Sequence, residues 1–540
     1  MSARTRTVAS VVSAVAVLSA GTAACTSGEE ASSTSSVLTV AAYSQPTLQA
    51  NFNPFSPNAL RGTVGLVYEQ LFDFNTADKN QFMPGLATKY TWGAGGRSLH
   101  LSLDSRAKWS DGTRLTADDV VFTFTFMKAH KLLALPLTTV VADGDGVTLS
   151  FSSPAYSQIQ QLGRVAVVPR KQWANQNPDT YINRNPMGSG PYSLGRVTGQ
   201  QVSFQARKDY WRQSVPVKQI NYVTTSSTNL LAQQMVRHEV DLAYAGIPNL
   251  KSQYLDKDPA HNHLWPIRAS MKPLLLNLRR APFDNVHVRK GIALALDRAK
   301  VANAYNPGVY QAVGPTGLTA QSWGSLIPDA DKEPLTQNRT AALQELAQAG
   351  YTLKGGRLVD AKGKQLSLEI LTVSTFADGM AYAQEVADQL SQSGIKATVP
   401  GEAPSAYVAD EGKHNFDAVF GDAYVYGSNL YNFYWSMLSP DSPQSVIGWK
   451  DAGTTAALDA LAKADPSGQA QATQALEKIM TDQVPTIPVV VKGTPYMYST
   501  TRFTGWPSEK NPYTTPDPGA VSGVYAEKLF LSLRPANSKG

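Results

Sequence analysis

The chain has 540 residues, of which 42% are hydrophobic and 17% charged, a composition typical of a folded globular protein. Its formal net charge is +6, spread along the sequence without a Lys/Arg block, so nothing in the sequence indicates a nucleic-acid surface. A chain of this length is expected to form about three domains. Its single cysteine excludes an internal disulfide.

The first 25 residues have the organisation of an export signal. Arg4 and Arg6 precede an apolar run from Val8 to Ala20, and four small residues then lead to Cys25. A charged start, a short apolar stretch and small residues before a cleavage site are typical of a secretory signal peptide. A cysteine directly after the cleavage site is the lipid acceptor in a bacterial lipoprotein signal.

We therefore expect residues 1–24 to be removed and Cys25 to carry lipid, with a flexible polar tether over 25–36. Thr22 departs from the usual lipoprotein pattern, so an ordinary secretory signal with an incidental cysteine stays open. The apolar run is shorter than the ~20 residues of a spanning helix. The mature chain is expected as a monomer on the outer face of the cell membrane, on its periplasmic or cell-wall side.

Hydrophobic patterns predict the elements of the first half of the chain. They are a strand at 37–41, a helix-like segment at 65–72, strands at 99–103 and 147–151, and a helix from about 117 to 128. Thr116 precedes that helix as a favourable N-cap residue. Asp118 and Asp119 fall in its first turn, where carboxylates interact favourably with the helix dipole.

The second half predicts alternating helices and strands. They are helices at 289–303, 338–349 and 379–393, and strands at 366–371 and 396–399. Gly350 and Gly394 follow two of the helices as typical C-terminal caps. Because a strand, a helix and a strand follow one another over 366–399, this segment predicts a β-α-β unit and the chain an α/β fold.

Several segments, in chain order, match the pattern of a single protein family. The most specific is Lys108–Thr113 followed by Leu115–Phe122. Shorter matches are Tyr68–Phe72, Pro84–Ala87, Asn185–Tyr192, Asp209–Trp211 and Pro282–Arg298. Together these segments resemble the large solute-binding proteins of ABC importers that bind oligopeptides, dipeptides or nickel (family 5, cluster C), and the first is close to the signature of that family. The resemblance extends over residues 38–535.

This resemblance implies an α/β fold of the periplasmic-binding-protein type II kind, in which two lobes enclose a cleft and an extra domain is inserted. The implied boundaries are 37–62, 183–273 and 487–540 for lobe I, 63–182 for the insert and 274–486 for lobe II. Most matching segments have structural roles in the family. Trp109–Gly112 is expected to be a turn with a core tryptophan, and Asn185–Tyr192 a Gly/Pro turn.

The function that the resemblance implies is that of a receptor, without catalytic activity and without a cofactor. A small molecule binds between the lobes, and hinge closure buries it. The closed receptor then docks on two permease subunits, whose cytoplasmic ATPases supply the energy. The chain itself contains no phosphate-binding GxxxxGK[ST] motif.

The chain departs from the pattern of the peptide-binding members, in which an aspartate of lobe II pairs with the free amine of the peptide. In an alignment through Asn432–Leu438, Tyr426 stands at that position, and Asp422 lies four residues earlier. A buried amine without a carboxylate would lose most of its binding energy. Asp422 could replace the missing acid only if the loop shifts.

Three segments resemble instead the branch that binds β-linked oligosaccharides such as cellobiose: Asn51–Phe55, Ser428–Leu438 and Thr504–Tyr513. Sugar faces stack on aromatic rings, and ring-edge hydroxyls bind amides and carboxylates. The residues expected to contact such a ligand are Tyr43, Asn53, Tyr424, Tyr426, Asn429, Tyr431, Trp435, Trp506, Glu509 and Asn511.

Other interpretations stay open. Each aromatic residue could instead pack in the core, and a peptide receptor of the same fold is the main alternative. A secreted hydrolase would use Ser105 or a pair of carboxylates in the cleft. Ser105 stands in an S-x-x-K pattern at 105–108, but the companion motifs are missing. His261 and His263 lack an obvious third ligand, which is typical of a solvated loop, so no metal site is expected.

Overall fold

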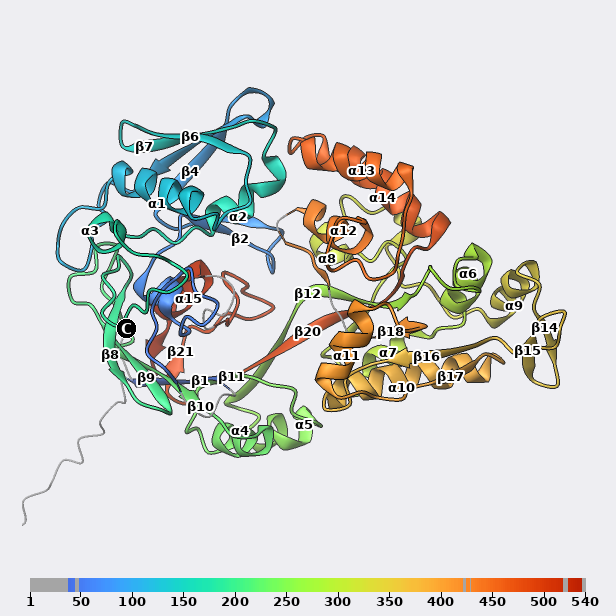
Figure 1. Cartoon of the computed structure of the whole chain (residues 1–540). Coiled ribbons are helices and arrows are strands. Elements are labelled where there is room, and N and C mark those ends of the chain that lie inside the picture. Colours follow the sequence, from blue (N-terminus) through green and yellow to red (C-terminus); the bar gives the residue numbers. More distant parts are fainter. Residues whose placement is uncertain (1–36, 44–47, 421–423, 428, 518–522, 537–540) are drawn as a thin grey trace, which may run out of the picture. The chain divides into compact units, whose positions relative to one another are not determined.

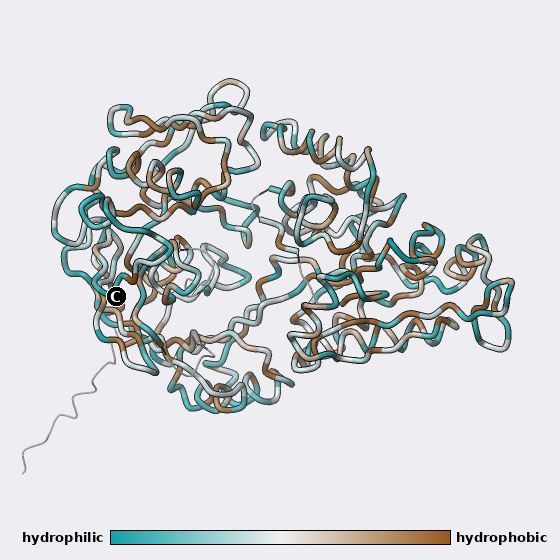
Figure 2. Tube along the Cα trace, in the orientation of Figure 1, coloured by the Kyte–Doolittle hydropathy of each residue, from teal (hydrophilic) through white to brown (hydrophobic). Residues whose placement is uncertain are grey.

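The computed structural model describes residues 37–43, 48–420, 424–427, 429–517 and 523–536. The expected signal peptide and tether, with Cys25, and the displaced acid Asp422 lie outside these residues. In the described part, none of the helices has the length and apolar character needed to cross a membrane, and hydrophobic residues occur in short stretches (Figure 2).

A 12-stranded mixed sheet runs through much of this part (Figure 1). Its main path is β17 (Lys396–Thr398), β16 (Ser367–Leu371), β18 (Ala418–Val419), β12 (Asn262–Leu276), β20 (Ile487–Ser499), β11 (Leu242–Tyr244), β1 (Val37–Tyr43), β10 (Gln219–Thr224), β9 (Gln201–Ala206) and β8 (Tyr192–Val197). Two further strands, β13 (Gln311–Ala312) and β19 (Tyr424–Val425), pair with β20 and β12. Parallel strands form two groups, β1 with β10 and β11, and β16 with β17 and β18.

The long strands β12 and β20 connect the two parallel groups. They pair with each other antiparallel, while β20 also pairs with β11 and β12 with β18. Prolines face each other at two levels of this ribbon, Pro266 opposite Pro495 and Pro273 opposite Pro488. Because proline has no N–H, neither level can form a complete pair of ladder hydrogen bonds.

Helices pack on this sheet or on one another around it, as is typical of an α/β fold. They are α4 (Thr228–Val236), α5 (Leu250–Gln253), α6 (Val286–Leu294), α7 (Arg298–Asn303), α8 (Ala320–Trp323), α9 (Arg339–Gln348), α10 (Ala377–Gln392), α11 (Pro404–Gly412), α12 (Leu430–Leu438), α13 (Ala452–Lys463), α14 (Gln469–Gln483) and α15 (Gly523–Ser532). Two further pairs of short antiparallel strands lie outside the sheet: the hairpin of β14 (Thr352–Lys354) and β15 (Arg357–Val359), and β21 (Phe503–Thr504) with β22 (Arg534–Pro535).

A separate four-stranded antiparallel sheet lies in the expected insert. Its order is β4 (Ala87–Trp92), β5 (Ser98–Leu103), β7 (Gly146–Phe151) and β6 (Leu137–Asp143), and α1 (Ala117–Ala129) packs on it. The remaining elements of the insert are β2 (Phe72–Asn75), β3 (Gln81–Pro84), α2 (Ile159–Gly163) and α3 (Arg170–Trp173). The predicted N-cap of α1 is confirmed, because Thr116 and Asp119 form a capping box. Trp109 is buried beside them, as expected, and its indole N–H donates to Asp119.

The predicted β-α-β unit is confirmed, since β16 and β17 are parallel and α10 connects them. Gly350 and Gly394 both have φ 88°, the left-handed conformation of a C-terminal cap. The single helix expected at 289–303 is wrong. The chain forms α6 and α7 instead, and Asp297 caps the second helix by accepting a hydrogen bond from the N–H of Lys300.

The helix expected at 65–72 is also wrong. Only one irregular turn forms at Thr63–Val67, and its Val64 and Gly65 have non-helical dihedrals. Tyr68 is extended, and Phe72 begins β2. The physical reason is the contact with α15, because a Cβ on Gly65 would lie 2.4 Å from the carbonyl oxygen of Gly523.

The hydrophobic core of the insert begins a few residues after residue 63, the expected start of the insert. Leu66, Val67 and Tyr68 belong to the cluster that also contains Leu38 and Phe204 of the large sheet. The core of the four-stranded sheet extends from Leu71 to Val167. The division into two lobes and an insert therefore stays a prediction, and the names lobe I, insert and lobe II are used here for the residue ranges given above.

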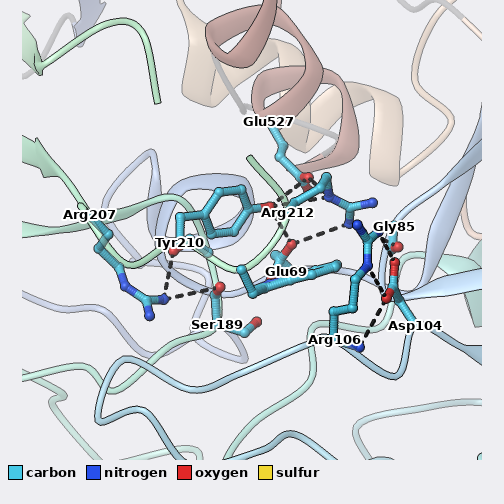
Figure 3. A network of polar contacts seen from close by, with 11 residues as sticks. Glu69, Gly85, Asp104, Arg106, Ser189, Arg207, Tyr210, Arg212 and Glu527 are labelled. Atoms are coloured by element: carbon cyan, nitrogen blue, oxygen red, sulfur yellow. Dashed lines mark hydrogen bonds and ion pairs between the residues drawn. The ribbon is translucent and has the colours of Figure 1, made fainter. Parts of the chain in front are cut away.

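A buried polar network joins the insert to lobe I (Figure 3). The carboxyl groups of Glu69 and Glu527 converge on the hydroxyl of Tyr210, at 2.8 and 3.0 Å, and on the guanidinium of Arg212 (Figure 3). The indole of Trp211 donates to Glu69 at 3.0 Å. Both carboxyl groups are almost completely buried. Arg212 is therefore the ion-pair partner of two acids that are shielded from water.

Candidate functional site

Ligands of open α/β sheets usually bind outside the carboxyl ends of the parallel strands. In the large sheet, β1, β10, β11 and β16 end at Tyr43, Thr224, Tyr244 and Leu371. Residues at or after these ends border one cavity of about 560 Å³, which we call the strand-end cavity. It is lined by Ala41, Arg61, Thr225–Thr228, Leu231, Tyr244–Gly246 and Phe376.

Four consecutive hydroxyl residues, Thr225–Thr228, form one wall of the strand-end cavity. Ser227 is the N-cap of α4, and its hydroxyl accepts a hydrogen bond from the N–H of Leu230 at 3.2 Å. The hydroxyl of Thr225 donates to the carbonyl of Ser227. Ser226 and Thr228 are exposed, so their hydroxyl groups are available to a ligand in the cavity.

Arg61 and Tyr244 form a second polar wall. The guanidinium of Arg61 donates to the Tyr244 hydroxyl and lies 5.2 Å from the centre of its ring. The ring of Tyr496 packs against Tyr244 from the core, with the ring centres 5.8 Å apart. These contacts fix a half-buried aromatic ring and a planar cation at the cavity wall.

Phe376 neither packs in the hydrophobic core nor caps the helix that it precedes. It is 58% exposed, although burying its ring would stabilise the protein. It is also the N-cap residue of α10, where Ser, Thr, Asp or Asn is favoured, and it forms no side-chain cap. An exposed aromatic ring in a cavity otherwise lined by hydroxyls is suited to contact a ligand.

A second cavity of about 270 Å³ adjoins the first and shares Tyr244–Gly246 with it; we call it the charged cavity. Asp378 and Lys492 line it. Within the described residues, neither side chain has an ion-pair partner. The hydroxyl of Tyr310 lies 3.5 Å from Asp378, and burial together with this carboxylate raises the pKa of Tyr310.

Two of the expected contact residues lie in the core of lobe II. Tyr424 and Tyr426 are each 3% exposed. Their hydroxyls donate to the carbonyls of Gln444 and Gly317, at 3.0 and 2.7 Å. Burial raises the pKa of Tyr426, and its ring packs 4.9 Å from that of Phe433.

The next expected residues follow on α12. Asn429 is buried and caps this helix, with its side-chain oxygen accepting a hydrogen bond from the N–H of Tyr431 at 3.0 Å. Tyr431 and Trp435 are half-buried against the same apolar cluster. None of the three lines the strand-end cavity or the charged cavity.

The expected residues of the C-terminal loop separate into two groups. Trp506 is 8% exposed, stacks on Tyr498 with ring centres 5.0 Å apart and donates to the carbonyl of Phe503. Glu509 and Asn511 are exposed. Glu509 borders a small hollow of about 30 Å³ beside Arg268 on β12.

The two expected residues near the N-terminus also differ. Asn53 is 1% exposed, and its amide donates to the carbonyls of Pro178 and Tyr181 at 2.7 and 3.0 Å. Tyr43 is the last residue of β1 and pairs with Thr224. Its backbone therefore lies at the strand ends that border the strand-end cavity.

Sequence reasoning missed Arg61, Thr225–Thr228, Tyr244 and Phe376. The strand ends themselves were the available signal, because residues 225–228 and 244–246 directly follow two short apolar runs. Which ends meet at one cavity depends on sheet topology, which local patterns do not give.

The residues considered for catalysis or metal binding lie elsewhere. Ser105 borders a separate cavity with Asp104 and Arg114. In the ranges that the structure describes, no group of three or more His, Cys, Asp or Glu residues could hold a metal ion. His261 contacts Asp258 at 2.9 Å, while His263 contacts Thr500 at 3.3 Å.

Solved structures with similar folds confirm the expected fold. The oligopeptide-binding protein of an oligopeptide ABC transporter from Thermotoga maritima superposes with a TM-score of 0.83 at 24% identity, covering 93% of this chain and 99% of that one. The same protein with bound mannohexaose superposes with a TM-score of 0.76. These similarities establish the fold of a type II periplasmic binding protein.

Sequence comparisons establish the family. A probable peptide-binding protein, YejA, from Agrobacterium fabrum is 26% identical over 430 residues, which are 68% of this chain and 69% of the relative. The family model of the bacterial extracellular solute-binding proteins, family 5, matches residues 81–445. This match covers more than half of the chain, which therefore belongs to the family 5 extracellular solute-binding proteins, the substrate receptors of ABC importers.

Proposed function

We propose that this receptor binds an oligosaccharide of the β-glucoside type in the strand-end cavity and delivers it to the permease of an ABC importer. The observation that carries the proposal is the lining of the cavity. It combines hydroxyl groups, a guanidinium and the exposed ring of Phe376, and its described lining includes no carboxylate. A neutral, hydroxyl-rich ligand needs no carboxylate partner, whereas the free amine of a peptide does.

In this proposal Phe376 stacks on a sugar face, and Tyr244 can contribute a second ring. Arg61 and the hydroxyls of Ser226 and Thr228 donate to ring-edge oxygens. The Thermotoga protein is named an oligopeptide-binding protein, yet one of its solved structures contains mannohexaose. That bound oligosaccharide supports this ligand class.

The residues expected from the sequence enter the proposal in different ways. Tyr43 ends β1, whose Ala41 lines the cavity, and Glu509 and Asn511 are exposed, so a longer ligand could reach them. Asn53, Tyr424, Tyr426, Asn429 and Trp506 each have a hydrogen bond within the fold, and Tyr431 and Trp435 are half-buried. We therefore assign ligand contact first to Phe376, Tyr244 and Arg61.

A peptide is the second candidate, and the charged cavity favours it. Asp378 and Lys492 are opposite charges that line the same cavity without pairing with each other. A short peptide offers an amine for the carboxylate and a carboxylate for the ammonium group. The name of the Agrobacterium relative, a probable peptide-binding protein, points the same way.

The experiment that separates the two candidates is isothermal titration of the mature protein with cellotetraose, mannohexaose and a tetra-alanine peptide. Two variants, Phe376→Ala and Asp378→Asn, each remove the residue that one candidate needs. Val141→Ala is the matched control, because it shortens an apolar side chain that is 51% exposed on β6.

If an oligosaccharide is the ligand, Phe376→Ala weakens binding about tenfold, or ~1.4 kcal/mol, which is the scale of a lost aromatic contact. Asp378→Asn and Val141→Ala then leave the affinity unchanged. Peptide binding that Asp378→Asn abolishes and Phe376→Ala spares would replace the first candidate by the second. Binding of any probe that all three variants leave unchanged would contradict both.

We further propose that Cys25 carries lipid and holds the receptor on the outer face of the cell membrane. The signal-like segment before it and the polar stretch after it support this. The partners that follow are the permease subunits and, through them, cytoplasmic ATPases. The receptor would work as a monomer.

A further inference from the structure

One side chain joins lobe II to the insert. The amide nitrogen of Asn429 donates a hydrogen bond to the carbonyl of Ser157, at 3.0 Å, across 272 residues of sequence. Both residues are 5% exposed, so water does not compete for this bond. Ser157 lies in a short turn, Tyr156–Gln158, at the start of α2.

The segment before Asn429 touches the same part of the insert. Gly427 has φ 69°, and a Cβ on it would lie 3.1 Å from the side-chain oxygen of Gln160. The amide of Gln160 in turn donates to Asp73 of β2 at 3.0 Å. Helix α13 also contacts the turn that contains Ser157. In the described residues, lobe II and the insert therefore contact each other around Asn429, Gly427 and α13 on one side and the turn at Tyr156–Gln158 with Gln160 on the other.

This contact lies at the end of a segment that is attached to the β12–β20 ribbon. The N–H of Tyr426 donates to the carbonyl of Ala269 on β12, and Val425 pairs with Ser270. Strand pairing thus connects β12 to β19, which closely precedes Asn429 in sequence, and a hydrogen bond connects Asn429 to the insert. A change in the angle between lobe II and the insert must move this bond.

We propose that Asn429 is a latch that holds lobe II against the insert and so limits how far the cleft opens in the unliganded receptor. Asn429 is then a positioning residue that acts without touching the ligand. The inference rests on the proposed cleft but on neither class of ligand.

Asn429 has two roles that a substitution can separate. Its side-chain oxygen caps α12, and its side-chain nitrogen forms the latch. Asn429→Asp and Asn429→Ser both keep an oxygen that accepts at the N-cap position. The aspartate has no donor for the carbonyl of Ser157 and adds a negative charge beside it. The serine hydroxyl is a donor, but its side chain is one bond shorter than that of asparagine, so it does not reach this carbonyl. Asn432→Ser is the matched control, an exposed asparagine on the same helix.

The test uses the unliganded mature protein and two measurements, hydrogen exchange of the segment 155–161 and the radius of gyration by small-angle X-ray scattering. The latch predicts about fivefold faster exchange of this segment in Asn429→Ser, the effect of ~1 kcal/mol from one lost hydrogen bond. The radius of gyration should rise in both variants, more in Asn429→Asp, while Asn432→Ser behaves like the wild type.

Unchanged exchange and an unchanged radius in both Asn429 variants would overturn the latch. A lower unfolding temperature without a larger radius would also overturn it, since it would assign Asn429 only a role in helix stability. Because no ligand is used, neither result depends on whether the proposed ligand is correct.

Discussion

At the residue scale, the two buried acids that join the insert to lobe I have a clear electrostatic consequence. Burial and the neighbouring charge of Glu527 raise the pKa of Glu69 to about 7, and burial also raises the pKa of Glu527. Arg212 offsets part of this effect by pairing with both carboxylates. The folded protein therefore binds a proton here at a pH where an unfolded chain, with an ordinary glutamate, has released it.

Because the pKa of Glu69 is higher in the folded state than in the unfolded state, we expect the free energy of unfolding to fall as pH rises. The raised pKa of Glu69 contributes stability that is fully present below pH ~4.5, the unfolded value, and is lost as pH rises through about 7. The expected loss is on the order of 3 kcal/mol. Urea unfolding between pH 4.5 and 8 should show a steeper decline in the wild type than in Glu69→Gln.

Glu333→Gln is the control for that comparison, because Glu333 is exposed and its removal should leave the slope unchanged. Equal slopes in the wild type and Glu69→Gln would show that Glu69 is ionised in the folded protein throughout this range.

Burial separates the residues that the sequence indicated as ligand contacts from those that line the strand-end cavity. The resemblance to the oligosaccharide-binding branch indicated Trp506 and Tyr426, but each ring is buried and its polar atom bonds a backbone carbonyl. Phe376 has the chemistry that was sought, yet it stands in a polar run, Ser374–Thr375–Phe376. Whether an aromatic side chain faces the core or a cavity depends on tertiary packing, which its neighbours in sequence do not encode.

At the scale of elements, the irregular turn at Thr63–Val67 shows how a distant helix determines local structure. Gly65 has φ 97°, and the backbone of Gly523, at the start of α15, occupies the place of its missing Cβ. The N–H of Gly523 also donates to Gln70 at 2.9 Å. This close backbone approach explains why an apolar segment with a helical pattern does not form a helix.

Gly65→Ala should therefore destabilise the protein by at least about 2 kcal/mol, from the clash with Gly523 and the positive φ together. Gly95→Ala separates the two causes, since Gly95 has φ 65° and no atom within 4 Å of its absent Cβ. Its cost should be about 1 kcal/mol. The measurement is the free energy of unfolding in urea, and equal costs for the two variants would contradict the close approach.

Elements with their own start and stop signals were predictable. The capping box at Thr116 and Asp119, the cap at Gly394 and the parallel pair β16 and β17 all follow from local sequence. The break between α6 and α7 was not, although Asp297 is a good N-cap residue. The apolar pattern continues across the break without interruption. An interpretation based on periodicity alone therefore predicted one helix where the chain forms two.

At the scale of the whole molecule, the family and the fold were predictable from ordered motifs, because such motifs persist where turns and core positions are constrained. The placement of the cavities was not, since it depends on how strands far apart in sequence meet. Ala41, Tyr244 and Phe376 border one cavity although more than 300 residues of sequence separate the first from the last.

The proposed lipid anchor concerns the molecule as a whole. Replacing Cys25 by serine should release the full chain from the membrane fraction into the medium or the periplasm, because one side chain would supply the attachment. The measurement is the distribution of the protein between membrane and soluble fractions of the cell. A soluble wild-type protein, or a Cys25→Ser variant that stays with the membrane, would contradict the anchor.

The facing prolines of β12 and β20 bear on how the two lobes can move. Between the pair Pro266 and Pro495 and the pair Pro273 and Pro488 lie Arg268 beside the small hollow and Lys492 in the charged cavity. The stretch between the two pairs is therefore bounded at both ends by residues that cannot donate a ladder hydrogen bond. If the lobes move about this ribbon, we expect it to bend at these two positions, so that Arg268 and Lys492 keep their places relative to each other.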